Sequence, residues 1–199
     1  KVEVEKELET LQDTIDELKQ VFKSMASKKK KDDVFWTTAV NEDDIKKFIK
    51  SIYSDAKRSV CIIPPPIAAS IGASIINDVF TQFVSALERG VKVRMLASSE
   101  FINLISFLPI NDEKTMDTLK KNLEIRTSKI IDSHAGIVDD NMVLLLQPHP
   151  LNKDRLLSVV KIWDVELARN LREEFDVMWK AGERIDVVEK IKMIQIAKR

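Results

Sequence analysis

The chain of 199 residues contains few of the residues on which common enzyme motifs depend. Its single cysteine, Cys61, excludes an internal disulfide framework and every metal motif that needs several cysteines. Its four glycines are too widely spaced for a dinucleotide-binding loop, a P-loop or a Gly-x-Ser-x-Gly nucleophile turn. Its two histidines have no cysteine neighbours, which makes a zinc site unfavourable. We therefore expect neither a metal nor a cofactor.

An excess of charge of one sign and long apolar runs are also lacking. Lysine plus arginine and aspartate plus glutamate number 32 each, so no attraction to nucleic acid or to a membrane surface is expected. No apolar run reaches the roughly 18 residues of a membrane span, and no signal peptide is visible. These absences predict a cytoplasmic protein without a membrane partner.

A heptad repeat occupies the N-terminal part of the chain. Its apolar members alternate spacings of four and three residues: Val4, Leu8, Leu11, Ile15, Leu18, Phe22 and Met25. So narrow a seam needs a partner helix, so we expect residues 1–31 to form a coiled coil that holds a homodimer together. The alternative is a helix that packs on its own domain, which usually shows a wider apolar stripe. The heptads already run at Lys1, which predicts a further N-terminal portion.

The lysine run at residues 28–31 cannot be buried, so we place the junction between stalk and domain there, with a nucleic-acid contact as the alternative. Strands and helices alternate from Val34 onward, which predicts βαβ units with a parallel sheet in a domain of residues 32–183. A last helix is predicted over residues 185–197, within a C-terminal segment of residues 184–199. That helix could pair with the stalk, dock on the domain or fray.

Hydrophobic periodicity and the residues that begin or end helices and strands predict the individual elements. Strands are predicted at residues 34–38, 60–63, 91–96, 123–127, 135–138, 142–146 and 157–162, and helices after Asn41, at 75–87, 112–122 and 165–181. Asn41 is the expected N-cap of its helix, and Gly90 is the expected C′ glycine that ends the helix before it. Cys61 lies in an apolar strand, where a thiol behaves as a small hydrophobe.

Several segments resemble a known superfamily. Residues 86–96, Ala-Leu-Glu-Arg-Gly-Val-Lys-Val-Arg-Met-Leu, resemble the helix–glycine–strand unit of phospholipase-D-like domains. Within that superfamily the chain resembles the effector domains of archaeal TrmB-type transcription regulators. Three further pieces agree with this pattern: Trp36-Thr37-Thr38, Ser133-His134 with the residues up to Asp140, and Ile162-Trp163-Asp164 leading into Phe175 to Trp179.

The resemblance covers Lys1 to about Arg184 and implies a fold class. It is an α/β fold with a phospholipase-D-like sheet flanked by helices, preceded by an N-terminal dimeric coiled-coil helix. Regulators of this type carry a winged helix ahead of the coiled coil, so DNA contacts would belong to an N-terminal domain that is not in this sequence.

The resemblance also defines what catalysis would need. The phospholipase-D reaction uses a histidine nucleophile, a lysine two residues later and an acid further along, supplied twice. After His134 these positions hold Gly136 and Asn141, and no second copy of the motif exists. The resemblance therefore implies a domain that is not an enzyme, with no catalytic residues.

Ligands of open α/β sheets bind beyond the carboxyl ends of the strands. The polar residues expected there, as a candidate ligand site, are Ser98, Ser99, Asp132, Ser133 and His134. The alternatives are helix capping by Ser98 and Ser99 and a purely structural role for His134. The three tryptophans could stack on a sugar ring, but core packing is the preferred interpretation: Trp36, Trp163 and Trp179.

These observations lead to one hypothesis and two alternatives. We expect the effector-sensing and dimerisation region of a transcription regulator, responding to a sugar or another polar metabolite through an altered stalk geometry. One alternative is a constitutive dimerisation scaffold without a ligand. The other is a phosphodiesterase or nuclease whose site is shared across the dimer.

Overall fold

The computed structural model describes residues 35–65, 73–99, 101–102, 110, 112–128, 131, 133–152 and 155–197, with the backbone alone for 73–77, 192 and 194–197. All of them belong to one compact unit, Val34–Arg199. The predicted coiled-coil residues, Val4 to Met25, lie outside the described residues, as does Asp132.

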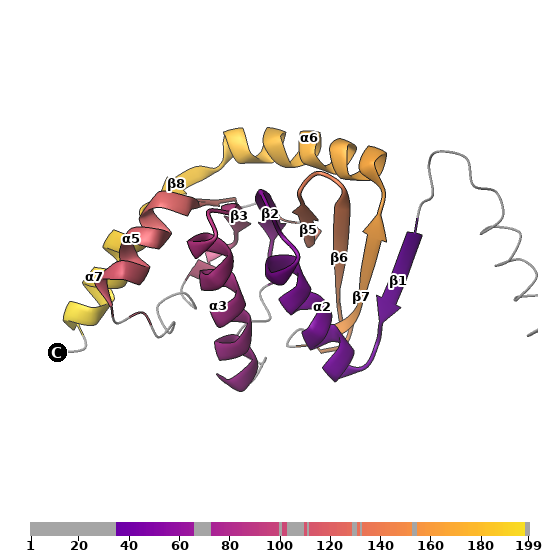
Figure 1. Cartoon of the computed structure of the whole chain (residues 1–199), viewed down its shortest axis with the longest axis horizontal. Coiled ribbons are helices and arrows are strands. Elements are labelled where there is room, and N and C mark those ends of the chain that lie inside the picture. The colour runs from indigo at the N-terminus through magenta and orange to yellow at the C-terminus, as the bar shows by residue number, and fades with distance from the viewer. Residues whose placement is uncertain are drawn as a thin grey trace, which may run out of the picture. The chain divides into compact units, whose positions relative to one another are not determined.

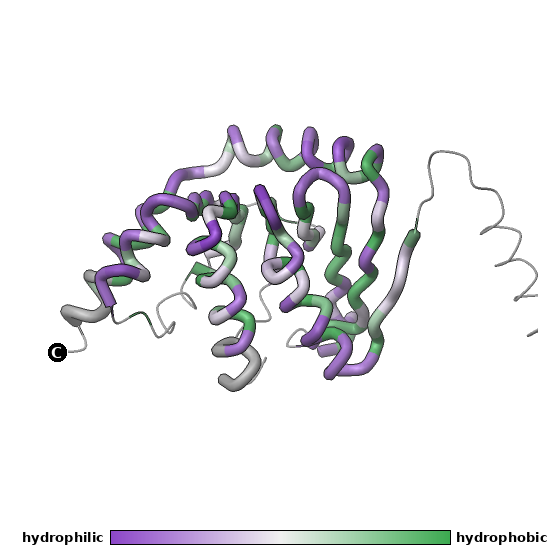
Figure 2. Tube along the Cα trace, in the orientation of Figure 1, coloured by the Kyte–Doolittle hydropathy of each residue, from purple (hydrophilic) through white to green (hydrophobic). Residues whose placement is uncertain are grey.

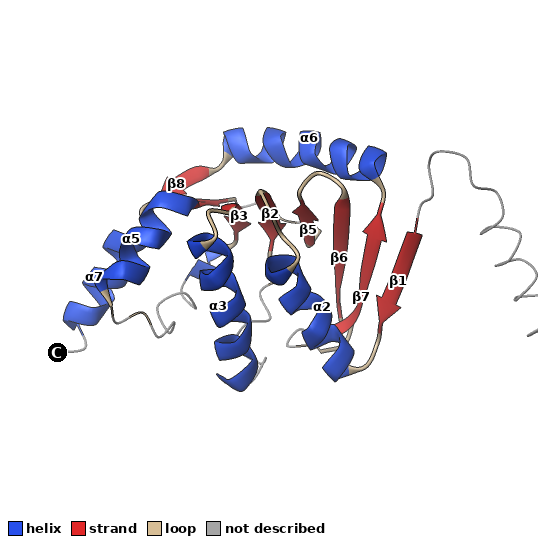
Figure 3. Cartoon of the chain, in the orientation of Figure 1, coloured by secondary structure: helices blue, strands red, loops and turns tan. Residues whose placement is uncertain are grey.

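Strands and helices alternate along the described chain (Figures 1 and 3). The strands are β1 (Phe35–Ala39), β2 (Ser59–Ile63), β3 (Lys92–Ala97), β4 (Leu123–Thr127), β5 (Ala135–Val138), β6 (Met142–Pro148), β7 (Leu156–Trp163) and β8 (Glu183–Ile185). The helices are α2 (Glu42–Ser54), α3 (Ala73–Glu88), α5 (Glu113–Asn122), α6 (Val165–Ala181) and α7 (Val187–Ala197). Every strand and helix predicted before residue 182 is present within a few residues of its expected bounds.

The eight strands form one mixed sheet in the order β1-β7-β6-β5-β2-β3-β4-β8. Strands β2, β3 and β4 are parallel neighbours, as predicted, because helices connect them. The prediction of a parallel sheet is wrong for the remainder, where β5, β6, β7 and β1 pair antiparallel. The short connections from β5 to β6 and from β6 to β7 permit only hairpins. Because β1 pairs with β7, the last strand of this series, β1 lies at the edge of the sheet.

Local sequence explains where helices begin and end. Asn41 caps α2, since its side chain accepts a hydrogen bond from the backbone N–H of Asp44 at 2.9 Å. Gly90, with φ of 88°, ends α3 in a Schellman motif. Its N–H donates to Leu87, and the N–H of Val91 donates to Ala86, at 2.9 and 3.1 Å. Both predicted caps are confirmed.

The C-terminal part corrects one prediction. A helix was expected from residue 185, but α7 begins at Val187, and Ile185 ends strand β8, which pairs antiparallel with β4. A strand of three residues, two of them charged, is too short to show a periodicity in the sequence. It is defined by its pairing with the outer side of β4. Val187 and Ile191 are buried, so α7 docks on the domain.

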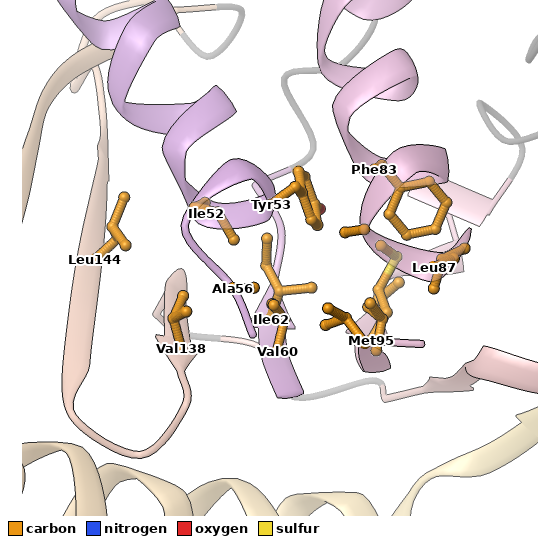
Figure 4. Close-up of a cluster of buried hydrophobic side chains, with 14 of the residues drawn as sticks. Ile52, Tyr53, Ala56, Val60, Ile62, Phe83, Leu87, Met95, Val138 and Leu144 are labelled. Atoms are coloured by element: carbon orange, nitrogen blue, oxygen red, sulfur yellow. The ribbon is translucent and has the colours of Figure 1, made fainter. Parts of the chain in front are cut away.

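The two faces of the sheet carry separate hydrophobic clusters, and apolar residues run along the central strands in Figure 2. Helices α2, α3, α5 and α7 cover one face, where Ile52, Val60 and Leu144 are fully buried (Figure 4). Helix α6 crosses the other face, where its buried residues pack on Cys61 and Ile137. No helix in the described ranges has the length and apolar character needed to cross a bilayer.

The tryptophan prediction holds for two of the three residues. Trp179 is 7% exposed and Trp163 packs against the core. Trp36, which we expected in the core, is 58% exposed. It is exposed because β1 is an edge strand and α6 does not reach over it, and neither fact can be read from local sequence.

Candidate functional site

The sheet brings most of the predicted ligand residues to one end of its central strands. Ile63 at the end of β2 pairs with Ala135 at the start of antiparallel β5, so His134 follows directly beyond the carboxyl end of β2. Ser98 follows the carboxyl end of β3, on the other side of β2. With two strand spacings between them, His134 and Ser98 are separated by roughly 10 Å of sheet. A small polar ligand of that size could span the gap.

His134 is half-buried and held by its neighbours. Its imidazole donates a hydrogen bond to the backbone carbonyl of Pro64, and its own carbonyl accepts from the N–H of Leu146 at 2.9 Å. Burial lowers the pKa of the imidazole, against a smaller opposing effect of the Pro64 carbonyl, so the ring is neutral at pH 7. Its Nδ1 is buried and has no hydrogen-bond partner among the described residues. A ligand could reach that atom only if the groups that cover it moved aside.

The serines differ in their surroundings. The hydroxyl of Ser98 accepts a hydrogen bond from the N–H of Phe101 at 3.3 Å, and its carbonyl accepts from Ile102 at 3.1 Å. Ser98 therefore caps the helical turn that follows, the alternative raised by the sequence. Ser99 and Ser133 are exposed at the same edge. Their hydroxyls can form the rim of a site, while the hydroxyl of Ser98 accepts the capping hydrogen bond and keeps its O–H as a donor.

The positions where the phospholipase-D motif would continue hold a glycine and an asparagine, Gly136 and Asn141. Gly136 lies in β5 facing α2, and a Cβ there would be 3.6 Å from Cδ1 of Ile52. A lysine would have to displace Ile52, which is completely buried. Asn141 lies in the turn at the opposite end of β5 from His134. In the described part of the chain, no group of three histidine, cysteine or acidic side chains could hold a metal ion.

An ion-pair network under α6 was missed by the sequence analysis. Arg94 of β3 contacts Asp176 of α6 at 2.7 Å, and Arg172 contacts Asp140 at 3.2 Å. Arg94 also lies over the ring of Phe175, with its guanidinium carbon 5.2 Å from the ring centroid. In sequence these charges look like ordinary solvated residues. Arg94 and Asp176 are 82 positions apart and Asp140 and Arg172 are 32 positions apart, and only the fold brings them together.

A third arginine also contacts an aromatic residue of α6. Arg126 of β4 lies 5.0 Å over the ring of Trp179 and donates to the Trp179 carbonyl at 2.8 Å, near the C-terminus of α6. Phe175 and Trp179 stack with centroids 5.5 Å apart. Beneath them, burial raises the pKa of the Cys61 thiol, so the thiol is protonated and unreactive at neutral pH. The network fastens α6 to the sheet.

Asp139 and Lys161 make polar contacts with residues near the C-terminal end of α2. The Asp139 carboxylate accepts hydrogen bonds from three consecutive backbone N–H groups, Lys57, Arg58 and Ser59, at 2.7–2.8 Å. These bonds hold its pKa below the usual value against the opposing effect of burial. The ammonium of Lys161, a residue only 7% exposed, contacts Asp55 at 2.7 Å and the hydroxyl of Ser51 at 3.1 Å. Both contacts hold the C-terminal end of α2 and the segment that follows it.

Solved structures of the same architecture define the class of fold. TrmBL2, an archaeal chromatin protein, superposes with a TM-score of 0.56 at 18% identity over 92% of this chain, which spans 65% of TrmBL2. NucT from Helicobacter pylori gives 0.56 at 17% identity, over 76% of this chain and 99% of its own. Nuc from Salmonella typhimurium, a phospholipase D family member, gives 0.50 at 16% identity, over 78% and 99%. The fold is therefore phospholipase-D-like.

Sequence comparison places the chain in a family. Residues 30–185 match the family model described as "Domain of unknown function (DUF7436)", and the chain belongs to that family. No curated protein sequence matches it. The family match ends at Ile185, the last residue of β8.

Proposed function

We propose that this chain is the effector-sensing and dimerisation region of a TrmB-type transcription regulator, with a catalytically inactive phospholipase-D-like domain. The observation that carries the proposal is the likeness to TrmBL2, which extends over 92% of the chain, against 76–78% for NucT and Nuc. TrmBL2 binds DNA, according to the description of its structure. The balanced charge of this chain suits a region whose DNA affinity resides elsewhere in the protein.

The effector would bind at the edge formed by the carboxyl ends of β2 and β3. His134 supplies a neutral acceptor there, and Ser99 and Ser133 supply hydroxyls that can donate or accept. A neutral hydroxylated molecule, such as a sugar or another polar metabolite, matches these groups. Binding would change the geometry of the paired heptad segments, and thereby the spacing of two DNA-binding heads.

Pairing through the heptads is tested by a double substitution. Leu11→Lys with Leu18→Lys places charges in the seam, and we expect the dimer to dissociate at least tenfold more readily in sedimentation velocity. Thr10→Lys with Gln20→Lys adds the same charge outside the seam and should leave the sedimentation coefficient unchanged. A double seam variant that sediments as the wild type would show that the heptads do not hold the dimer.

The likeness to Nuc, a phospholipase D family member, favours one alternative, a phosphodiesterase that uses His134 from each protomer. We expect no hydrolysis of bis(p-nitrophenyl) phosphate or of single-stranded DNA above the buffer rate, because Gly136 supplies no cation for the phosphoryl oxygens. The assay compares the wild type with His134→Ala. Cleavage by the wild type that disappears in the variant would establish the enzyme instead.

A further inference from the structure

Strand β1 forms one edge of the sheet (Figure 1). It pairs with β7 at five consecutive positions, Phe35 with Trp163 through Ala39 with Val159, without a bulge. No described strand pairs with its outer side, so a row of backbone N–H and C=O groups faces outward.

The two edges of the sheet differ in how they are protected. Monomeric proteins blunt their edge strands with charges, prolines, bulges or very short strands, because a regular edge recruits another strand. Strand β8 fits this rule, since it has three residues and two of them, Glu183 and Arg184, are exposed charges. Strand β1 has the sequence Phe-Trp-Thr-Thr-Ala, with no charge, no proline and a regular ladder. Strand β1 therefore lacks the features that keep an edge strand from pairing with another strand.

Exposed aromatic residues adjoin this edge. Phe35 is 60% exposed and Trp36 is 58% exposed, on opposite faces of β1. Together they expose roughly 250 Å² of mostly apolar surface, to which Leu145 and Val165 add on the side of Trp36. A stable dimer commonly covers about 800 Å² per partner. The aromatic pair, its neighbours and a strand backbone form a substantial part of such an interface.

We propose that β1 pairs antiparallel with β1 of a second copy, about a two-fold axis at Thr37, so that one sheet continues through the dimer. The strand is self-complementary in this register. Trp36 would lie opposite the partner's Thr38, and Phe35 opposite the partner's Ala39, so each large side chain meets a small one. A second copy thus fills this edge without any change in either strand.

The chain length permits both contacts in one dimer. Residues 26–34 separate the last heptad position, Met25, from β1. Nine residues can span up to roughly 30 Å, and the two copies of Phe35 would be only about 14 Å apart. This contact adds to the heptad pairing of the proposed function, and its failure would leave that pairing and the ligand response unaffected.

Disulfide trapping on the full chain tests the pairing. In the proposed register only position 37 meets itself, at a Cα separation of about 5 Å, which a disulfide can bridge. Thr37→Cys should form a disulfide-linked dimer under mild oxidation at least tenfold faster than Trp36→Cys or Thr38→Cys alone. Co-expressed Trp36→Cys and Thr38→Cys should cross-link as fast as Thr37→Cys. The wild type is the control, because Cys61 is only 1% exposed.

Other results would overturn the inference. No cross-linking at any of the three positions excludes pairing at this edge, provided that each variant unfolds near the wild-type temperature. Equal rates at all three positions indicate random collision between domains tethered elsewhere. Fastest self-linking at position 36 or 38 contradicts the register at Thr37.

Discussion

Replacing Phe175 by alanine is expected to lower the free energy of unfolding by about 3–5 kcal/mol. Phe175 is 1% exposed and is the largest completely buried side chain among the described residues. Its ring stacks on Trp179 and carries the guanidinium of Arg94 on its face. The substitution leaves a cavity and also removes the apolar cover of the Arg94–Asp176 pair, so α6 loses its central contact with the sheet. Urea denaturation followed by circular dichroism measures the change.

A matched control lies on the same helix. Val177 is 70% exposed, and Val177→Ala should change the stability by less than about 0.5 kcal/mol, because it removes no buried contact. If Phe175→Ala costs less than about 1 kcal/mol, α6 does not depend on this contact. The ion-pair network would then hold the helix by itself.

Replacing Asp139 by alanine should cost about 3 kcal/mol, the loss of charge-assisted hydrogen bonds to three backbone N–H groups. Asp139 also has φ of 51°, a left-handed conformation that strains alanine. Asp139→Gly removes that strain but not the loss of the carboxylate, so it should fall between alanine and wild type. Asp139→Asn keeps an acceptor and tolerates the conformation, and we expect the smallest loss from it.

The pH dependence of stability offers a second measurement of the same contact. The folded protein holds the pKa of Asp139 below its ordinary 3.8, so the carboxylate stabilises the fold at pH values above 3.8. That stabilisation is lost as the pH falls below 3.8 and through the folded-state pKa. Asp139→Ala should therefore have a flatter stability profile below pH 4 than the wild type. Parallel profiles would show that the bonds to residues 57–59 contribute little.

Sequence periodicity predicted helix α6 from Val165 to Ala181 and the hairpin of β5 and β6 because both are determined by neighbouring residues. Asp164 caps α6, with its side chain accepting from the N–H groups of Glu166 and Leu167. The turn contains Asp139 and Asp140 at φ of 51° and 58°, and acidic residues tolerate this left-handed conformation in tight hairpins. Both signals lie within a few residues of the elements they define.

The features that the sequence could not predict depend on distant partners. Strand β8 exists only because β4 presents an edge, and the exposure of Trp36 follows from the position of β1 in the strand order. Arg94 looks like an outward-facing residue of an alternating strand, yet α6 covers it. For the site, the strand-end rule brought His134 and Ser98 to the same end of the sheet, and the capping role of Ser98 was one of the two that the sequence offered.

The fold also shows what surrounds the position at which the phospholipase-D motif would carry a lysine. Gly136 lies where the reaction needs a lysine, and Ile52 packs against it as part of the core. Beyond the carboxyl end of β2, His134 keeps a buried Nδ1 without a hydrogen-bond partner among the described residues.

Thermal unfolding of the chain with candidate effectors at millimolar concentration tests the sensor proposal most directly. The panel comprises sugars, sugar phosphates, nucleotides and organic acids. A ligand present at 100 times its dissociation constant adds about 2.7 kcal/mol, which raises the midpoint of a chain this long by about 5–10 °C. We predict such a shift with a neutral hydroxylated compound and its loss in His134→Ala. No shift with any compound, or a shift that His134→Ala retains in full, would contradict a sensor at this site.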